Sequence, residues 1–141
     1  MFKLFKIRFL LCFVALATSI TGYSQSENTE TQSEEKVFQI VDEMPFFKEG
    51  DAAMFKYLAE NIKYPASATE NKEQGLIFVS FIVGKSGEVI NPVILQGVYE
   101  SLNAEAIRVV ESMDKKWNPG KQNGEIVKVR YNLPIRFTLG K

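Results

Sequence analysis

The last strand-like segment of the chain, residues 127–139, alternates apolar and polar residues without a break. The apolar side chains fall at every odd position: Val127, Val129, Tyr131, Leu133, Ile135, Phe137 and Leu139. Successive side chains of a β-strand point to opposite faces, so this pattern predicts a strand with one buried face and one solvent-facing face. Such a strand is typical of an antiparallel sheet that covers a core on one side. Its length lets it project beyond its neighbours, which leaves backbone donors and acceptors free to pair with another chain.

The rest of the folded region combines helical and strand patterns. An apolar stripe over residues 55–62 predicts an amphipathic helix that ends before Tyr64-Pro65. Residues 75–83 form an apolar run, and a glycine-containing turn connects it to a second strand-like run over residues 89–95, which predicts a hairpin. Leu102-Asn103 supplies the apolar residue and N-cap that begin a second amphipathic helix.

The first 24 residues are expected to be a secretory signal. Three basic residues among the first eight precede an apolar run over residues 9–20, and small residues follow up to Ser24. This is the layout of a cleaved signal, and we place the new N-terminus at Gln25. The apolar run is shorter than the roughly 20 residues that span a bilayer, so cleavage is favoured over an uncleaved inner-membrane anchor. The mature protein is therefore expected in the periplasm.

The mature chain is expected to contain a linker and one domain. Residues 25–36 are polar and acidic and contain no aromatic residue, which predicts a disordered linker. The folded domain is expected over residues 37–141. Cys12 is the only cysteine and lies in the segment that cleavage removes, so neither a disulfide nor a sulfur-based metal site is expected.

Several classes of chemistry have no residues to support them. The chain contains no histidine, which removes the most common general base and metal ligand. No glycine-rich phosphate-binding loop is present, and Asp42-Glu43 is better explained as a pair of solvated loop acids than as a catalytic pair. Outside the basic N-terminus the chain is mildly acidic, so it lacks the footprint of a nucleic-acid-binding protein. We expect a protein that is not an enzyme and that holds no cofactor or metal.

One series of motifs spans nearly the whole expected domain. In chain order it comprises Tyr64-Pro65, Gly75-x-x-x-Val79-x-Phe81-x-Val83, Leu102-x-x-Glu105-Ala106, Lys116-Trp117-x-Pro119-Gly120, Gly124 and Pro134-Ile135-x-Phe137. The order and spacing of these motifs over residues 37–139 resemble the C-terminal domain of TonB proteins. The segment Asp42-Glu43-Met44-Pro45-x-Phe47 is similar to the form found in Bacteroidetes. The resemblance implies an α+β fold, a three-stranded antiparallel sheet with two helices packed on one face.

The resemblance also implies a partner. Domains of this family bind outer-membrane transporters by pairing with a short segment at the transporter's N-terminus, the TonB box. Full-length members are anchored in the inner membrane, have a long proline-rich span and act with proton-driven inner-membrane proteins. An added strand gains main-chain hydrogen bonds with little demand on side-chain identity, which suits one module that serves several transporters. The residues expected at the partner-binding edge are Val127, Val129, Tyr131 and Leu133, with Tyr64 and Pro65 as secondary contacts.

Two functional hypotheses stay open. The first is a TonB-type energy transducer, and the second is a free periplasmic module that binds a peptide or protein without transmitting force. The lack of histidine favours the second, because the family's anchor carries a histidine on which coupling depends. Whether two copies exchange strands to form a homodimer is also left open.

The residues expected to have a structural role are Trp117, Pro119, Gly120, Gly124, Pro134 and Phe137.

Overall fold

A computed structural model describes residues 35–140, which belong to one compact unit. The expected signal, residues 1–24, and most of the expected linker, residues 25–36, lie outside the described residues. No helix within residues 35–140 is both long enough and apolar enough to cross a membrane.

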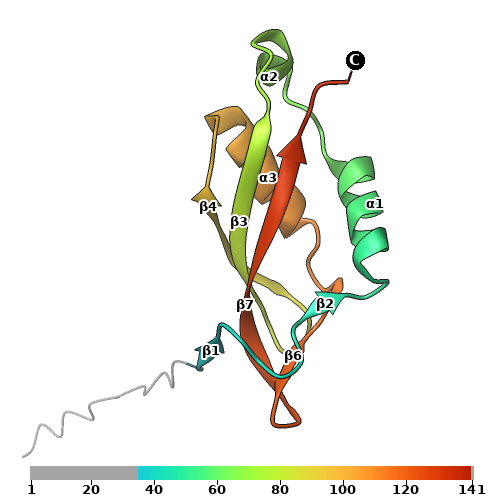
Figure 1. Ribbon diagram of the computed structural model, residues 1–141, viewed down its shortest axis with the longest axis vertical. Helices are drawn as coiled ribbons and strands as arrows, with labels where there is room; N and C mark the ends of the chain where they lie inside the picture. Colours follow the sequence, from blue (N-terminus) through green and yellow to red (C-terminus); the bar gives the residue numbers. More distant parts are fainter. Residues whose placement is uncertain (1–34, 141) are drawn as a thin grey trace, which may run out of the picture. The chain divides into compact units, whose positions relative to one another are not determined.

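Helices and strands are interleaved along the described part of the chain (Figure 1). In order they are β1 (Val37–Phe38), β2 (Phe46–Phe47), α1 (Asp51–Asn61), α2 (Ala66–Glu70), β3 (Gly75–Val83), β4 (Val89–Gln96), α3 (Glu100–Glu111), β5 (Trp117–Asn118), β6 (Gly120–Gln122) and β7 (Glu125–Phe137). The two predicted helices correspond to α1 and α3, the predicted hairpin to β3 and β4, and the alternating segment to β7. The expected N-cap of the second helix is wrong, because α3 begins at Glu100 with Tyr99 as its N-cap and Asn103 lies inside the helix.

The main sheet has the strand order β1-β7-β3-β4, and β6 pairs with the start of β7. β3 and β7 are antiparallel and pair continuously from Gly75 opposite Phe137 to Val83 opposite Val129. β1 adds a short parallel pairing beside Lys128 and Val129. A separate two-stranded sheet joins β2 to β5. The sheet therefore has an antiparallel centre, β4-β3-β7, to which two short strands are added.

The α+β class is confirmed, whereas the expected three-stranded sheet with two helices is wrong in detail. The sheet has five strands, and α2 is an additional helix. The additions are short, since β1 has two residues, β6 three and α2 five. Segments as short as β6 and α2 do not show the period of a strand or of a helix, so neither is predictable from its own sequence.

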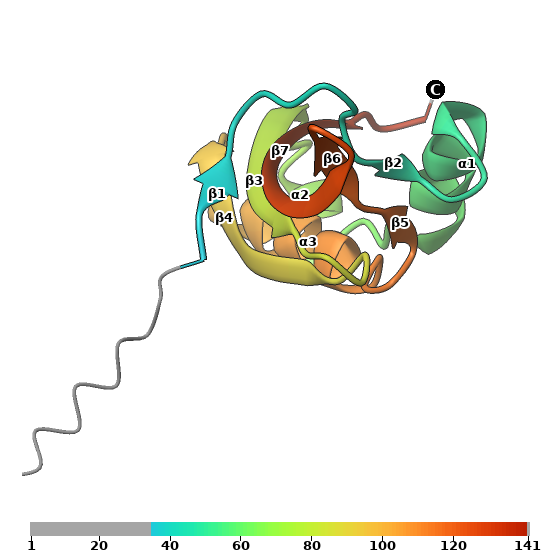
Figure 2. The ribbon, with the colours of Figure 1, turned by 90° about the horizontal axis from the view of Figure 1, so that it is seen from below.

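One hydrophobic core lies between the sheet and the helices. From Ile77 onward the odd-numbered residues of β3 are fully buried, namely Ile77, Val79, Phe81 and Val83. Met54 and Leu58 of α1 join the same cluster as Leu102, Ala106, Val109 and Val110 of α3. Because both helices reach the same face of the sheet through these side chains, α1 and α3 pack on one side of it. α3 lies alongside β3 and β4 (Figure 2).

Candidate functional site: the free edge of β7

β7 has one edge that is paired along most of its length and one that is paired only near its start. β3 occupies the first edge from Val129 to Phe137. Val129 also pairs with Phe38, so β1 lies on the opposite edge. Within residues 35–140 no strand pairs with Arg130–Phe137 on that second edge. Alternate residues of an antiparallel strand direct their N–H and C=O groups away from the partner, so this stretch, the free edge, presents unpaired backbone groups.

The expected partner-binding side chains mainly build the core. Val129 and Leu133 are buried, and Val127 and Tyr131 are half-buried. The Tyr131 ring lies 4.9 Å from the Trp117 ring between centroids, and burial raises the pKa of its hydroxyl, with a further contribution from Asp51. Of these four residues only Tyr131 and Leu133 lie in the free edge, because the backbone of Val127 already pairs with β6 and that of Val129 with β1.

Tyr64 and Pro65 lie at the other end of β7 from Val127. The Tyr64 ring packs edge-on against Phe137 at 5.9 Å between centroids, and its hydroxyl donates to the carbonyl of Glu73. Pro65 is the residue before α2. Val127 and Phe137 are ten residues apart, which corresponds to about 33 Å along a strand. The structure thus brings Tyr64 to the end of the free edge and not to its beginning.

An apolar groove lies between α1 and the last part of β7. It has a volume of about 440 Å³. Its lining residues are Phe55, Leu58, Ala59, Ile62, Leu76, Pro134, Ile135 and Arg136. Phe55 is 57% exposed, so a large apolar ring stands in contact with solvent beside the free edge. A strand added to this edge would meet apolar side chains and the guanidinium of Arg136.

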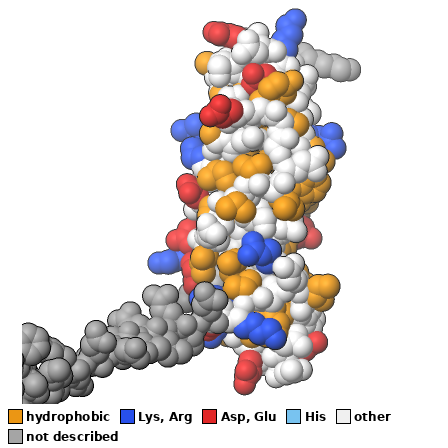
Figure 3. Space-filling model, turned by 90° about the vertical axis from the view of Figure 1, so that its left-hand side faces the viewer, with side chains coloured by type: hydrophobic (Ala, Val, Ile, Leu, Met, Phe, Trp, Pro, Cys, Tyr) orange, Lys and Arg blue, Asp and Glu red, His pale blue; other side chains and the backbone are white. Residues whose placement is uncertain are grey.

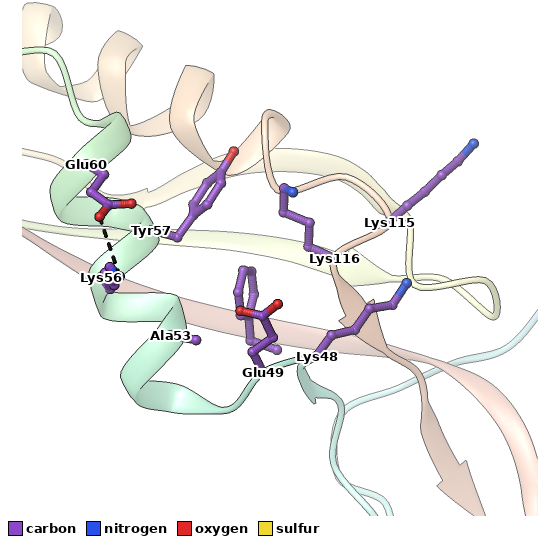
Figure 4. A pocket seen from close by; sticks show the side chains of 9 residues that line it. Lys48, Glu49, Ala53, Lys56, Tyr57, Glu60, Lys115 and Lys116 are labelled. Atoms are coloured by element: carbon purple, nitrogen blue, oxygen red, sulfur yellow. Dashed lines mark ion pairs between the residues drawn. The ribbon is translucent and has the colours of Figure 1, made fainter.

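A second hollow, of about 430 Å³, lies on the other side of α1 (Figure 4). Lys56 pairs with Glu60 at 3.9 Å, and the ammonium of Lys116 lies 5.1 Å from the centre of the Tyr57 ring. Lys48 and Lys115 extend away from Tyr57 toward solvent. Four lysines and two glutamates line this hollow, so charges of opposite sign are mixed within it.

The edge of the sheet formed by β4 is also apolar and exposed. Its most exposed large side chains, together with those of the following loop, are Val93, Leu95, Val98 and Tyr99. Figure 3 views the side of the molecule on which β4 lies in Figure 1, and hydrophobic side chains gather along its middle. Pro92 and the positive φ of Asn91, 48°, interrupt this strand, which limits its ability to pair with another chain.

The segment before β2 is fixed to the β6–β7 hairpin. The backbone N–H of Glu43 donates to the carbonyl of Lys121 at 3.0 Å, and that of Lys121 donates back at 2.9 Å. The Asp42 N–H donates to Oε1 of Gln122 at 3.0 Å, and the N–H of Asn123 donates to the Asp42 carboxylate at 2.9 Å. Asp42 is therefore a structural residue that satisfies backbone groups of the turn.

Trp117 fills the space between β2, β3 and β7. Its side chain is 1% exposed, and its ring lies 5.7 Å from Phe47 and 5.3 Å from Phe81 between centroids. Gly120 is in close contact with Val129, since a Cβ there would lie 2.5 Å from Cγ2 of that residue. Asn123 and Gly124 both have positive φ, as the two-residue turn between β6 and β7 requires.

Sequence reasoning missed the residues that hold β1 on β7. One carboxylate oxygen of Glu35 lies 3.0 Å from Nζ of Lys128, and the other contacts Nζ of Lys85. Hydrogen bonds from Lys85 and Lys128 lower the pKa of this carboxyl. The three residues are far apart in the sequence, so only the register of β1 on β7 reveals the contact. Within residues 35–140 no group of three or more acidic, histidine or cysteine residues is placed to hold a metal.

Comparison with known proteins agrees with this architecture. The NMR solution structure of Helicobacter pylori TonB-CTD (residues 179-285) is similar at 20% sequence identity and a TM-score of 0.50, over 62% of this chain and 78% of that chain. A second NMR solution structure of the same H. pylori domain (residues 194-285) shows 20% identity and a TM-score of 0.49, over 64% of this chain and 94% of that chain. At such identity the first likeness shows the fold alone. No curated protein matches the chain.

The family assignment rests on a match to the sequence itself. The model of the Gram-negative bacterial TonB protein C-terminal family matches residues 60–139, more than half of the chain. This match confirms the resemblance carried by the motifs from Tyr64-Pro65 to Phe137. The chain belongs to the family of C-terminal domains of Gram-negative bacterial TonB proteins.

Proposed function

We propose that this domain binds the N-terminal segment of outer-membrane TonB-dependent transporters, the TonB box, by strand addition along the free edge of β7. The observation that carries the proposal is the unpaired backbone of Arg130–Phe137 in a member of the TonB C-terminal family. The domain acts in the periplasm, in energy-coupled transport, and is a binding domain rather than an enzyme. Proton-driven inner-membrane proteins are the further partners that this role requires.

The chemistry of the free edge supports this function. Backbone groups supply the affinity in strand addition, so the partner needs little sequence identity from one transporter to the next. The groove beside Pro134 and Arg136 offers one place where an apolar side chain of the partner could select among sequences. β1 also supports the proposal, because it is an extended segment that already pairs with this edge in the parallel direction.

A substitution in the groove tests the proposal with a matched control on the same helix. Ala59 lines the groove and Ala52 is an exposed residue of α1 outside it. We expect Ala59→Arg to weaken binding of transporter N-terminal peptides about tenfold or more, a loss of about 1.4 kcal/mol. Ala52→Arg should leave the affinity unchanged. Titration calorimetry with the full chain measures both, and equal effects of the two substitutions would place the partner elsewhere.

The backbone contribution is tested from the peptide's side. Proline at Val129 or Tyr131 is unsuitable, because these residues also pair with Val83 and Phe81 of β3. N-methylation of one peptide amide at a time removes a single donor and leaves the domain intact. Strand addition predicts that methylation weakens binding at alternate positions only. A uniform response along the peptide, or none, contradicts strand addition.

The second candidate function is a free periplasmic binding module that transmits no force, and the lack of histidine in the chain favours it. The N-terminal sequence and intact mass of the protein from periplasmic and membrane fractions distinguish the two. A soluble form that starts at Gln25 supports the free module. A form in the inner membrane that retains Met1 supports the transducer.

A further inference from the structure

β1 is the most weakly held strand of the main sheet. Its ladder on β7 consists of Val37 opposite Lys128 and Phe38 opposite Val129. Both side chains are only half-buried, and neither belongs to the core cluster. By contrast, β3 pairs with β7 through nine residues whose alternate side chains are fully buried. Separating β1 from β7 therefore exposes little apolar surface and breaks few backbone hydrogen bonds.

The contacts that add to this short ladder are mostly polar and lie at the surface. The Glu35 carboxylate lies between Lys85 and Lys128, with 40% of its side chain exposed. Nζ of Lys36 lies 4.7 Å from the centre of the Phe38 ring. Exposed ion pairs contribute little to stability, so these contacts favour this position of β1 but hold it only weakly.

β1 is followed by a bend and then by a segment that is hydrogen-bonded to the β6–β7 hairpin. Gln39 and Ile40 form a bend, and Ile40 is 84% exposed. Immediately after the bend, Val41 is buried, and Asp42 and Glu43 are hydrogen-bonded to the β6–β7 hairpin. Residues 35–38 can therefore swing away from β7 about the bend while the rest of the domain keeps its contacts.

We propose that residues 35–38 are an internal occupant of the strand-accepting edge, and that they must leave before a partner strand can pair with Lys128 and Val129. The inference rests on the proposed function and adds its regulation. A partner that pairs from Lys128 to Phe137 replaces two residue pairs by up to ten, so the exchange favours the longer strand. When the partner strand runs parallel to β7, its own carboxylate can take the place of Glu35 between Lys85 and Lys128. That carboxylate must stand two residues before the first residue of the partner that pairs with β7.

The apparent affinity of the edge then depends on how often β1 is open. A site that is available in a fraction f of the molecules shows a dissociation constant raised by 1/f, so an edge that is open about one tenth of the time binds about tenfold more weakly. Variants in which β1 cannot pair should bind a strand more tightly than the natural chain. A structural role of β1 predicts the opposite, because loss of a structural strand would loosen β7.

The test uses the chain's own segment as the probe. A synthetic peptide with the sequence of residues 34–40 is titrated into the ¹⁵N-labelled full chain, and amide shifts of β7 report binding. The double variant Val37→Pro/Phe38→Pro lacks both backbone donors of β1. We expect it to bind the peptide at least about threefold more tightly than the natural chain. Glu35→Gln should act in the same direction, and Glu111→Gln, an exposed residue of α3, should have no effect.

The outcomes separate this inference from the proposed function. If the double-proline variant stays folded by circular dichroism and binds the peptide no more tightly than the natural chain, or does not bind it, the inference is overturned. No transporter peptide is involved, so this measurement reports on the opening of β1 separately from the test of the proposed function. Transporter peptides that bind the natural chain and the double-proline variant equally well would leave the proposed function intact and overturn the inference.

Discussion

Glu105 accepts two hydrogen bonds from Arg108, from Nε at 2.8 Å and from Nη2 at 2.6 Å. The same carboxylate accepts the backbone N–H of Lys63 at 2.6 Å, and Nη2 of Arg108 donates to the carbonyl of Asn61 at 2.7 Å. The Glu105 side chain is almost fully buried. The pair therefore joins α3 to the end of α1, where backbone groups of α1 have no partner within their own helix.

Replacement of Glu105 by glutamine should destabilise the domain. The amide of glutamine has the shape of the carboxylate but carries no charge, so the hydrogen bonds to Arg108 become weaker. It also places an NH₂ group, itself a donor, against the N–H donors of Arg108 or Lys63. We expect the free energy of unfolding to fall by about 1–3 kcal/mol. Urea denaturation followed by circular dichroism measures it. Glu111→Gln, at an exposed site on the same helix, is the control, and equal losses in both variants would contradict the role of the buried pair.

The same pair predicts how stability depends on pH. Burial alone would raise the pKa of Glu105, but the hydrogen bonds and charges of Arg108 and Lys63 outweigh it and lower the pKa. The unfolded chain then binds more protons than the folded chain as the pH falls. The stabilisation is therefore complete above the pKa that Glu105 has in the unfolded chain, and it is lost as the pH falls through the lower pKa of the folded chain. The difference in unfolding free energy between the natural chain and Glu105→Gln should be constant near neutral pH and shrink in acid. A difference that stays the same under acid conditions would contradict the assignment.

Two glycines with the same φ predict very different costs on replacement by alanine. Gly87 and Gly124 both have a φ of 79°. A Cβ on Gly87 would lie 2.0 Å from the carbonyl oxygen of Trp117, whereas a Cβ on Gly124 would meet nothing within 4 Å. Gly124→Ala should cost only the backbone strain, about 1–2 kcal/mol, and Gly87→Ala about 2–5 kcal/mol because the backbone must also move. Thermal unfolding of the two variants measures the difference, and equal costs would mean that this contact relaxes freely.

Trp117 should tolerate phenylalanine much better than alanine. Alanine leaves a cavity between Phe47, Phe81 and Tyr131 and should cost about 3–5 kcal/mol of unfolding free energy. The indole Nε1 is buried and has no hydrogen-bond partner within residues 35–140, so phenylalanine removes an unsatisfied donor together with part of the ring. We expect Trp117→Phe to cost less than about 2 kcal/mol. Chemical denaturation checks both values, and similar losses would point to a polar contact of the indole.

Hydrogen exchange should show an alternating pattern along the free edge. Between Arg130 and Phe137 every second amide is bonded to β3 and the others face outward. The bonded amides should exchange slowly and the outward ones quickly, apart from Pro134, which has no amide. Residue-resolved exchange measured by NMR tests this, and uniformly slow exchange would mean that something covers the edge in solution.

The long elements were predictable because each carries its own periodic signal. The alternation over residues 127–139 predicted β7, and the apolar stripe beginning at Phe55 predicted α1. Phe55 itself, however, lies exposed beside the groove, because that stripe is wider than the face that α1 buries against the core. A helical pattern shows that one face is apolar but not how much of that face other residues will cover.

The candidate site was predictable only in part, because the sequence does not show which residues pair with the second edge of β7. The free edge follows from the length of β7, but the pairing of Val37-Phe38 with Lys128 and Val129 joins residues about ninety positions apart. Two apolar residues after an acidic linker do not show which strand they will pair with. Likewise Glu105 was visible within a motif, yet its contact with the end of α1 depends on how the two helices pack.

The direction of β1 also determines how a mechanical load would act on a strand bound in the same direction. The chain enters the domain at Glu35, near the Lys128 end of β7, and a parallel partner would leave the interface near Phe137. Tension between these two points runs along the strands, so all the hydrogen bonds between them bear the load together, in shear. An antiparallel partner would leave at the same end as the domain's own chain, and the same bonds would then open one at a time.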